Sequence, residues 1–185
     1  MGLPQLQSRL TRTEFMDWEA LQADKHEFVA GEVFAMVGAR RSHVTVTLNI
    51  AAQLKAHLRG GPCRAYMADM KLEVAQADAV IYPDVMVTCH VEDRTAELAM
   101  HHPKVIVEVL SDSTAAYDRG GKFACYRQIE SLQEYALVDP DTRQVEVFRR
   151  MDRGDWLLAA SESAQGLVLK SLDFAADLDA VFEDL

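Results

Sequence analysis

Two short apolar runs dominate the hydrophobic pattern of the chain, AVIYPDVMVTC at residues 79–89 and KVIVEVL at residues 104–110. Nearly continuous runs of this length are typical of strands that are buried on both faces of a sheet. Apolar and polar side chains alternate over residues 63–74, which predicts one further strand there. Turn residues separate three later segments with strand composition, at 134–140, 143–150 and 155–161.

Apolar side chains at helical spacing predict the helices of the chain. The longest helix is expected over residues 43–61, with Ser42 as its N-cap and a pair of glycines at its end. A capping box formed by Thr11 and Glu14 opens a short amphipathic helix. After it, the Ala30–Gly31 step in HEFVAGEVFAMVG predicts a hairpin turn between two short strands. Two further segments predict a second helix and a short helix or capping turn, at 118–133 and 172–185.

Strand and helix patterns follow one another without an internal repeat, a low-complexity segment or a linker. The 185 residues, 49% of them hydrophobic, can bury one substantial core. We therefore expect residues 1–185 to form a single α/β domain with helices packed on a central mixed β-sheet. No apolar run approaches the ~20 residues of a membrane-spanning helix, and the N-terminus has no signal-like apolar segment. We expect a soluble, cytoplasmic protein.

The cysteines and the net charge limit the classes of function. Cys63, Cys89 and Cys125 are odd in number and lie far apart, without a C-x-x-C spacing. This pattern argues against a disulfide framework and a structural zinc site, so we expect buried thiols. The formal net charge of −10 counts against tight, nonspecific nucleic-acid binding, because such binding relies on a basic face. A protein of this charge that acts on DNA needs a local basic surface.

One acid stands inside each of the two apolar runs, Asp84 in the first and Glu108 in the second. Burying an ionised carboxylate is unfavourable unless it is paired, hydrogen-bonded or bound to a metal ion. One interpretation places both acids near strand ends, solvated or paired with arginine. The other assigns them to a divalent cation, Mg2+ or Mn2+, which suits carboxylate oxygen. Pro83 favours the second, because it cannot donate a ladder hydrogen bond and so makes the strand irregular beside Asp84.

The Pro-Asp step followed by Glu108 resembles the PD-(D/E)XK signature of restriction-endonuclease-like nucleases. That signature has a lysine two residues after the second acid, where this chain has Leu110. Lys122, in the next predicted helix, makes the chain resemble the Uma-type endonuclease family, in which the motif lysine has moved from strand to helix. The resemblance covers about residues 12–182 and rests on an ordered series of motifs, HEFVAGEVFAM, YPDVMV, VIVEVLSDST and EYALVDP.

The resemblance implies a restriction-endonuclease-like α/β/α core with a central mixed β-sheet, and metal-dependent hydrolysis of phosphodiester bonds in DNA. It implies that Asp84 and Glu108 bind Mg2+ or Mn2+, with the backbone carbonyl of Val109 as a further ligand. Lys122 would orient or help to deprotonate the attacking water and offset charge on the phosphate. Glu32, the upstream acid of the family pattern, would hold a second ion or one of its waters.

Four further residues are candidates for accessory roles. His43, at the start of the long helix, is either a phosphate-binding or proton-relay residue or a structural histidine. Arg40 and Arg41 precede that helix, and they either bind an anion with help from the helix dipole or lie in a solvated loop. Tyr126 follows Lys122 by one helical turn, and we expect it to pack so that it positions the lysine.

Two functions are consistent with these residues. The first is a small Mg2+-dependent endonuclease acting on DNA. The second is a binding or regulatory module that keeps the nuclease fold but cuts weakly, or not at all, without a partner. The ordered set Glu32, Asp84, Glu108 and Lys122 makes the endonuclease the leading hypothesis, whereas the net charge and the missing strand lysine count somewhat in favour of the module. Double-strand cleavage by such folds usually needs two sites, so a homodimer is expected by analogy.

Overall fold

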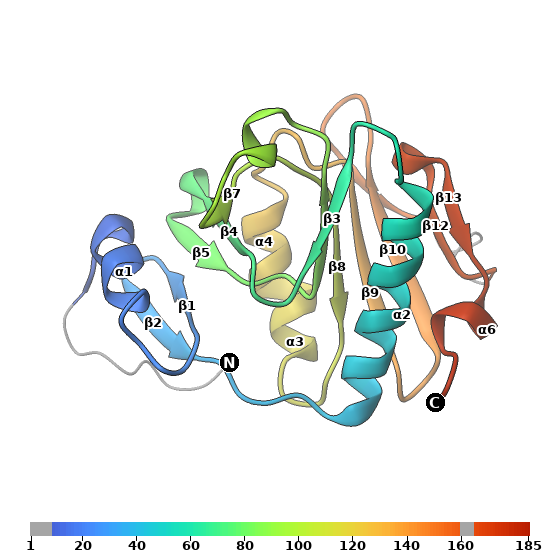
Figure 1. Cartoon of the computed structure of the whole chain (residues 1–185), viewed down its shortest axis with the longest axis horizontal. Coiled ribbons are helices and arrows are strands. Elements are labelled where there is room, and N and C mark those ends of the chain that lie inside the picture. Colours follow the sequence, from blue (N-terminus) through green and yellow to red (C-terminus); the bar gives the residue numbers. More distant parts are fainter. Residues whose placement is uncertain (1–8, 160–164) are drawn as a thin grey trace.

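A six-stranded mixed β-sheet forms the centre of the molecule (Figure 1). The structure is a computed structural model, which describes residues 9–159 and 165–185. In sheet order the strands are β11 (Trp156–Leu158), β10 (Gln144–Arg150), β9 (Glu134–Asp139), β8 (Pro103–Val109), β6 (Val85–Thr88) and β3 (Arg64–Met67). β8 and β9 are parallel and the other neighbours are antiparallel, which confirms the predicted mixed sheet.

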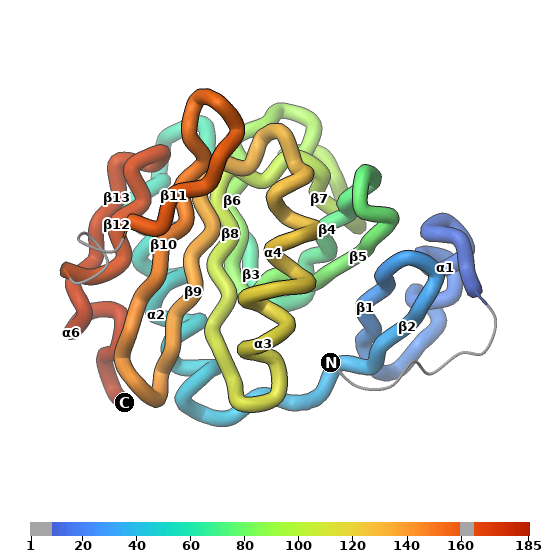
Figure 2. The backbone as a smooth tube through the Cα atoms, turned by 180° about the vertical axis from the view of Figure 1, so that it is seen from behind, coloured from blue at the N-terminus to red at the C-terminus, as the bar shows by residue number. Residues whose placement is uncertain are grey.

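Helices cover both faces of this sheet. α2 (Arg41–His57) lies on one face (Figure 1). The other face is covered by three helical segments in series (Figure 2): α3 (Ala115–Tyr117), a π-helical turn (Asp118–Lys122) and α4 (Phe123–Tyr126). The predicted α/β/α layering is therefore confirmed.

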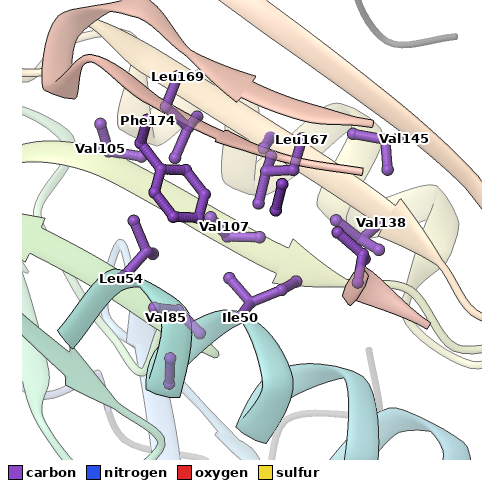
Figure 3. Close-up of a cluster of buried hydrophobic side chains, with 14 of the residues drawn as sticks. Ile50, Leu54, Val85, Val105, Val107, Val138, Val145, Leu167, Leu169 and Phe174 are labelled. Carbon is purple, nitrogen blue, oxygen red and sulfur yellow. The ribbon is translucent and has the colours of Figure 1, made fainter. Parts of the chain in front are cut away.

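Side chains of β8 alternate between two hydrophobic cores, because successive residues of a strand point to opposite faces. Val107 packs with Ile50 and Leu54 of α2 in the first core (Figure 3). Ile106 packs in the second core, together with side chains of α4. Glu108 has the same parity as Ile106, so its side chain points to the face that α3 and α4 cover.

A second sheet flanks the central one in the order β2-β1-β5-β4-β7. Its strands are β1 (His26–Val29), β2 (Glu32–Ala35), β4 (Lys71–Val74), β5 (Ala79–Ile81) and β7 (Ala99–Met100). α1 (Arg12–Glu19) packs on the β1–β2 hairpin, where the rings of Phe15 and Phe28 stack with centroids 5.2 Å apart. The hairpin and α1 stand beside the central sheet in both views (Figure 1, Figure 2).

The C-terminal part of the chain completes the first core. β12 (Leu167–Leu169) and β13 (Phe174–Ala176) form a two-stranded sheet whose apolar side chains pack with those of α2. α6 (Leu178–Val181) follows and contacts α2. Short 3-10 helices occur at Ala75–Ala77, Glu92–Arg94 and Lys170–Leu172.

Several predicted elements are confirmed. The Thr11–Glu14 capping box opens α1 with both of its reciprocal hydrogen bonds. The β1–β2 hairpin turns at Ala30 and Gly31, whose φ angles of 50° and 90° are those that a two-residue hairpin turn needs. β9, β10 and β11 lie in the predicted segments, although residues 160–161 of the last prediction fall outside the described residues.

Two predicted strands are each divided between the two sheets. The prediction of one strand over residues 63–74 is wrong, because the chain turns at Ala68, with φ +53°, between β3 and β4. The alternation continues across this turn, so the pattern alone did not reveal it. The run at 79–89 likewise divides into β5 and β6. Residues 82–84 connect the sheets, which confirms the irregularity predicted at Pro83.

The helices differ from the predictions at their ends. α2 begins at Arg41 with Arg40 as its N-cap, so Ser42 lies inside the first turn and does not cap the helix. Residues 118–133 do not form one helix, because the helical segments run from residue 115 to residue 126 and include the π turn. The tail at 172–185 contains β13 in addition to the expected short helix, α6.

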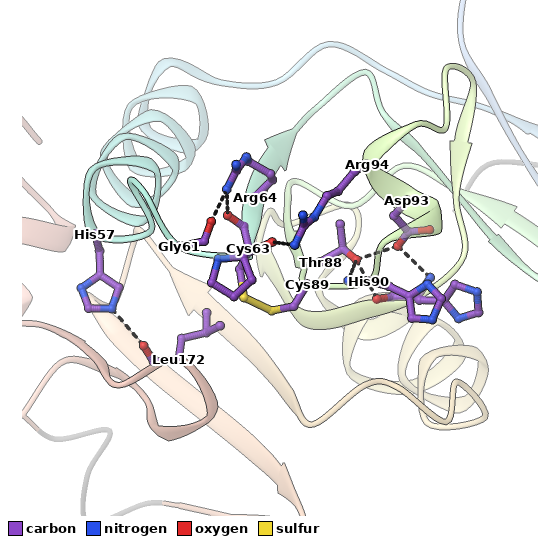
Figure 4. The surroundings of a disulfide bond; sticks show 12 residues. His57, Gly61, Cys63, Arg64, Thr88, Cys89, His90, Asp93, Arg94 and Leu172 are labelled. Carbon is purple, nitrogen blue, oxygen red and sulfur yellow. Dashed lines mark hydrogen bonds between the residues drawn. A yellow bond between two sulfur atoms is a disulfide. The ribbon is translucent and has the colours of Figure 1, made fainter.

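Cys63 and Cys89 form a disulfide (Figure 4), contrary to the expectation of free thiols. β3 and β6 are antiparallel with Arg64 opposite Thr88, so the two cysteines are the next pair across the strands. Their Cα atoms are 4.0 Å apart although the cysteines are separated by 26 positions in sequence. Strand register brings them together, and spacing along the chain could not show it. Cys125 is a buried free thiol, as expected.

No helix among the described residues is long and apolar enough to cross a membrane. Disulfides persist mainly in oxidising compartments. The Cys63–Cys89 bond therefore gives no support to a cytoplasmic location, which stays a prediction. The single-domain organisation over residues 1–185 also stays a prediction.

We expect a thiol reagent to label one cysteine per chain when the protein is denatured without reductant, because only Cys125 of the three cysteines has a free thiol. A colorimetric thiol titration measures this number, and prior reduction should raise it to three. Cys125→Ser is the control and should lower the unreduced count to zero. Three reactive thiols in the unreduced wild type would contradict the disulfide.

Candidate active site

Asp84 lies in an open cleft of about 970 Å3. The β1–β2 hairpin and the segment after it form one wall, with Phe34 and Val37. The first turn of α2 contributes His43, and the loop after β8 contributes Thr114. The cleft is large enough for an extended polar ligand rather than for a single ion.

The carboxylate of Asp84 is held from two sides. Asp84 precedes β6, where Pro83 has ended the strand pairing. Its Oδ2 accepts a hydrogen bond of 2.8 Å from the backbone N–H of Val109 and lies 3.2 Å from His43 Nε2. Burial alone would raise the pKa of Asp84, but the hydrogen bond and charge of His43, with Lys122 and the Val109 amide, lower it. Asp84 is therefore held as a carboxylate.

Glu108 is buried in β8, with 1% of its surface exposed. Its Oε1 accepts hydrogen bonds from Tyr126 Oη at 2.6 Å and from Lys122 Nζ at 3.1 Å. Its Oε2 accepts from the backbone N–H of Asp84 at 3.3 Å. Burial raises the pKa of Glu108 well above its usual value; Lys122 opposes this rise, while Asp84 and Asp118 add to it.

Lys122 is the cation at the centre of this group. It is 7% exposed, and its Nζ lies 3.1 Å from Glu108 Oε1, 3.4 Å from Glu27 Oε1 and 3.5 Å from Asp118 Oδ1. Burial would lower the pKa of Lys122, but the surrounding carboxylates raise it well above its usual value. The lysine therefore stays charged, donates a hydrogen bond to Glu108 and forms ion pairs with Glu27 and Asp118.

Two glycines precede Lys122 in the π-helical turn, and the structure explains the second of them. A π turn inserts one extra residue into a helix and is frequent at functional sites. Gly121 lies against the ring of Tyr117, with which a Cβ at this position would collide. The hydroxyl of Tyr135 donates to the carbonyl of Asp118 at 2.9 Å and anchors the start of the turn. The glycines lower helix propensity, but Gly121 is needed for the close packing beside the lysine.

The structure brings Glu27, rather than Glu32, to the lysine. Glu27 is a buried residue of β1 whose Oε1 also accepts from the backbone N–H of Tyr82 at 3.3 Å. Glu32 begins β2 directly after the hairpin turn, two cross-strand pairs nearer the turn than Glu27, and is exposed. No local pattern singled out Glu27, because Lys25 and His26 precede it and only Phe28 and Val29 follow it as apolar neighbours.

Asp118 adds a fourth carboxylate. It is 2% exposed, and among the described residues its buried Oδ1 has no hydrogen-bond partner, although the Lys122 ammonium lies within ion-pair distance. Burial is the main reason why its pKa is raised. Four carboxylates thus face one ammonium and the imidazole of His43. The acids therefore outnumber the cationic groups, and Asp118 Oδ1 has no hydrogen-bond partner among the described residues. Both features fit a site that takes up a divalent cation.

The accessory candidates divide into those in the site and those outside it. His43 contacts Asp84; burial would lower its pKa, but Asp84 raises it overall. Tyr126 contacts Glu108 directly, so it positions the acid as well as packing beside the lysine. Arg40 lines the cleft but pairs with Asp141 at 2.6 Å.

Arg41 and Leu110 lie outside the acid cluster. Arg41 donates from Nη1 to the carbonyl of Asp184 at 3.1 Å and so ties α2 to the C-terminal segment. Leu110, which has the place of the usual motif lysine, is 5% exposed and packs in the second core. An apolar residue there is compatible with the site because Lys122 reaches Glu108 from the helix that covers the same face.

The fold and the site define a class of protein. A mixed sheet between helical layers, with acids at the ends of two neighbouring strands, is the restriction-endonuclease-like α/β fold. The chain belongs to the Uma2 family, whose model is described as "Putative restriction endonuclease" and matches residues 12–180. This match confirms the resemblance that the ordered motifs indicated.

Individual proteins support the same relationship. Two uncharacterized proteins of Synechocystis sp., slr1290 and sll1609, are each 34% identical to this chain, over 177 and 151 residues. The first alignment covers 96% of this chain and 93% of the relative, and the second covers 80% and 85%. A crystal structure from Anabaena variabilis, described as "a putative nuclease belonging to DUF820", matches with a TM-score of 0.73 and 16% identity. It covers 94% of this chain and 97% of that chain, and it shows the shared fold.

We expect Glu108→Gln to raise the melting temperature (Tm) of the metal-free protein at about pH 8. Because the pKa of Glu108 is raised, its contribution to stability is present below the unfolded-state pKa, about 4.3, and is lost as pH rises toward the folded-state pKa. Glutamine cannot ionise, so the Glu108→Gln protein does not lose this stability as pH rises. Thermal unfolding with a chelator present should give a gain of roughly 2–4 °C.

The gain should disappear near pH 4, where Glu108 is largely protonated in both the folded and the unfolded states. Glu32→Gln is the matched control, since this glutamate is exposed, and it should leave Tm unchanged at both pH values. A Glu108→Gln protein that is less stable than the wild type near pH 8 would show that the pKa of Glu108 is not raised.

Proposed function

We propose that this protein is a divalent-metal-dependent endonuclease that hydrolyses phosphodiester bonds of DNA. The observation that carries the proposal is the contact of 3.1 Å between Lys122 Nζ and Glu108 Oε1, beside the cleft that Asp84 lines. This contact supports a complete nuclease site, because Lys122 reaches Glu108 from the helical segment, whereas the usual signature has its lysine on the strand.

Asp84 and Glu108 would hold the cation, together with the backbone carbonyl of Val109. The amide of Val109 donates to Asp84, and the N–H and C=O of one strand residue point to the same side. The Val109 carbonyl therefore faces the region of Asp84. Oxygen donors of this kind suit Mg2+ or Mn2+. Glu27 takes the place proposed earlier for Glu32 as the upstream acid, since it lies beside Lys122.

A bound divalent cation supplies Lewis acidity, which polarises the phosphate and lowers the pKa of a water molecule. Lys122 keeps its proton among the carboxylates, orients the attacking water and stabilises the negative charge that develops on the phosphate oxygens. His43 donates to Asp84 and fixes its orientation. Tyr126 fixes Glu108 in the same way.

The distribution of charge favours a second function. Lys25 and Arg40 line the cleft, but Lys25 pairs with Asp69 and Arg40 pairs with Asp141. The net charge of −10 also weakens the attraction of DNA phosphates. The protein would then be a nuclease-fold module that cuts weakly, or not at all, until a partner delivers the DNA. A homodimer, expected by analogy, is one such partner.

We expect the purified protein to nick supercoiled plasmid DNA with Mg2+ or Mn2+, and Lys122→Ala to lower the nicking rate at least about 100-fold. The reason is the loss of the cation that stabilises developing charge. Lys55→Ala, at an exposed position of α2, is the matched control and should cut like the wild type. Circular dichroism at the assay temperature must show that the Lys122 variant is folded, because its removal leaves buried acids unpaired.

Equal rates for the wild type and a folded Lys122→Ala variant would overturn the assignment of Lys122. Persistent inactivity of the wild type, with intact metal binding, would instead favour the module that needs a partner.

We expect Mg2+ binding, measured by isothermal titration calorimetry, to be lost in Asp84→Ala and in Glu108→Ala, because each supplies an oxygen ligand. Mg2+ is the suitable probe because it disfavours imidazole ligands elsewhere on the protein. Glu32→Ala is the control and should bind like the wild type, whereas Glu27→Ala should weaken binding through the lost negative charge. Unchanged binding in both the Asp84 and the Glu108 variants would remove the metal site from consideration.

A further inference from the structure

Three ligand-type side chains meet in the loop between β6 and β8, at the opposite end of these strands from the cleft. His90, Glu92 and His102 each offer one ligand atom, and these atoms lie within 4.8 Å of one another. His102 Nε2 is 3.4 Å from Glu92 Oε2, and the rings of His90 and His102 have centroids 4.0 Å apart. The backbone N–H of Glu92 donates to His90 Nδ1 at 3.4 Å.

A buried carboxylate holds the loop in this shape. Asp93 is fully buried, and its Oδ2 accepts from Thr88 Oγ1 at 2.7 Å and from the backbone N–H of His102 at 3.0 Å. Its Oδ1 accepts from the backbone N–H of His101 at 2.9 Å. Asp93 therefore ties the end of β6 to the start of β8 and brings the two histidine-bearing segments together (Figure 4).

The Cys63–Cys89 disulfide also restrains the backbone of this loop, at the residue before His90. Cys89 directly precedes His90, so the bond to Cys63 anchors the backbone of the first histidine (Figure 4). The backbone of the site is thus set before any ligand binds, and only exposed side chains need to move. Preorganisation of this kind lowers the entropic penalty of binding.

This cluster is separate from the candidate active site. β6 and β8 are antiparallel, with Thr88 opposite Pro103 at one end and Val85 opposite Val107 at the other. Asp84 lies beyond the second end and His90 beyond the first. The six residue-to-residue steps from Asp84 to His90 span about 20 Å at the ~3.3 Å rise of a strand. His90, Glu92 and His102 do not line the cleft.

We propose that His90, Glu92 and His102 form a binding site for a transition-metal ion, with Zn2+ as the preferred occupant. Two imidazoles and one carboxylate are a common zinc donor set, which leaves a fourth position for solvent. Imidazole nitrogen disfavours Mg2+ and Ca2+, so this site would not take the hard cations that suit the acid cluster. The proposal does not depend on the nuclease function.

The metal-free geometry is close to that of a zinc site. Bonds of about 2.0–2.1 Å to zinc place tetrahedral donor atoms about 3.3 Å apart, so the present atoms have to approach by roughly 1 Å. The side chains of Glu92 and His102 are 73% and 37% exposed and can rotate by this amount. The His102 imidazole and the Glu92 carboxylate now contact each other, and a bound cation would lie between them. A bound ion would cross-link the two ends of the loop.

Isothermal titration calorimetry with Zn2+ tests the proposal on the disulfide-bonded protein, without thiol reductant, because free Cys63 and Cys89 would themselves bind zinc. We expect a Zn2+-binding event, distinct from any uptake of Zn2+ by the acid cluster, that is at least about tenfold weaker in His90→Ala and in His102→Ala. His101→Ala is the matched control: its side chain is 47% exposed and lies in the same loop outside the cluster. It should retain this event unchanged, and the event should also persist in Asp84→Ala, in which the acid cluster has lost a ligand.

Thermal unfolding supplies a second readout that also checks the fold. Without metal, the histidine variants should melt close to the wild type, because they replace exposed or half-exposed side chains. Saturating Zn2+ should raise Tm by roughly 5 °C more in the wild type and in His101→Ala than in His90→Ala or His102→Ala, in which only the acid cluster can still take up the ion. Absence of Zn2+ binding in the wild type, unchanged binding in both variants, or loss of binding only in Asp84→Ala would overturn the proposal.

Discussion

The ion contacts of Lys122 are the interaction on which the candidate site depends. Its ammonium joins Glu27 of the hairpin, Glu108 of β8 and Asp118 of its own π turn. Without this cation, three buried carboxylates would face one another across three elements, which is strongly unfavourable. The π turn and the packing of Gly121 against Tyr117 keep the lysine directed at the acids. Ion pairs as well as apolar packing therefore hold the π turn, β8 and the β1–β2 hairpin together.

The sequence predicted the parts of the site that depend on local pattern. Asp84 and Glu108 could be recognised because an acid in an apolar strand needs a partner, and Lys122 followed from the family resemblance. Glu27 was missed in favour of Glu32, since strand pairing and the path of the hairpin decide which glutamate faces inward.

The fold was predictable to a similar extent. The mixed sheet and its two helical layers follow from the hydrophobic pattern. The distribution of strands between two sheets, the π turn and the Cys63–Cys89 bond depend on long-range register, which no local pattern contains. The same register places two sets of ligands at opposite ends of β6 and β8, oxygen donors at one end and imidazoles at the other. If both proposals hold, one strand pair carries separate positions for a hard cation and a transition metal.

The most direct test of whether a helix lysine completes this site is a crystal structure of the protein soaked with Mn2+. We predict an anomalous peak about 2.0–2.3 Å from a carboxylate oxygen of Asp84, a carboxylate oxygen of Glu108 and the carbonyl oxygen of Val109. Lys122 Nζ should remain within hydrogen-bond distance of Glu108 and of a water on the metal. A structure with no peak between Asp84 and Glu108, or with Lys122 turned away from an ion bound there, would contradict this account.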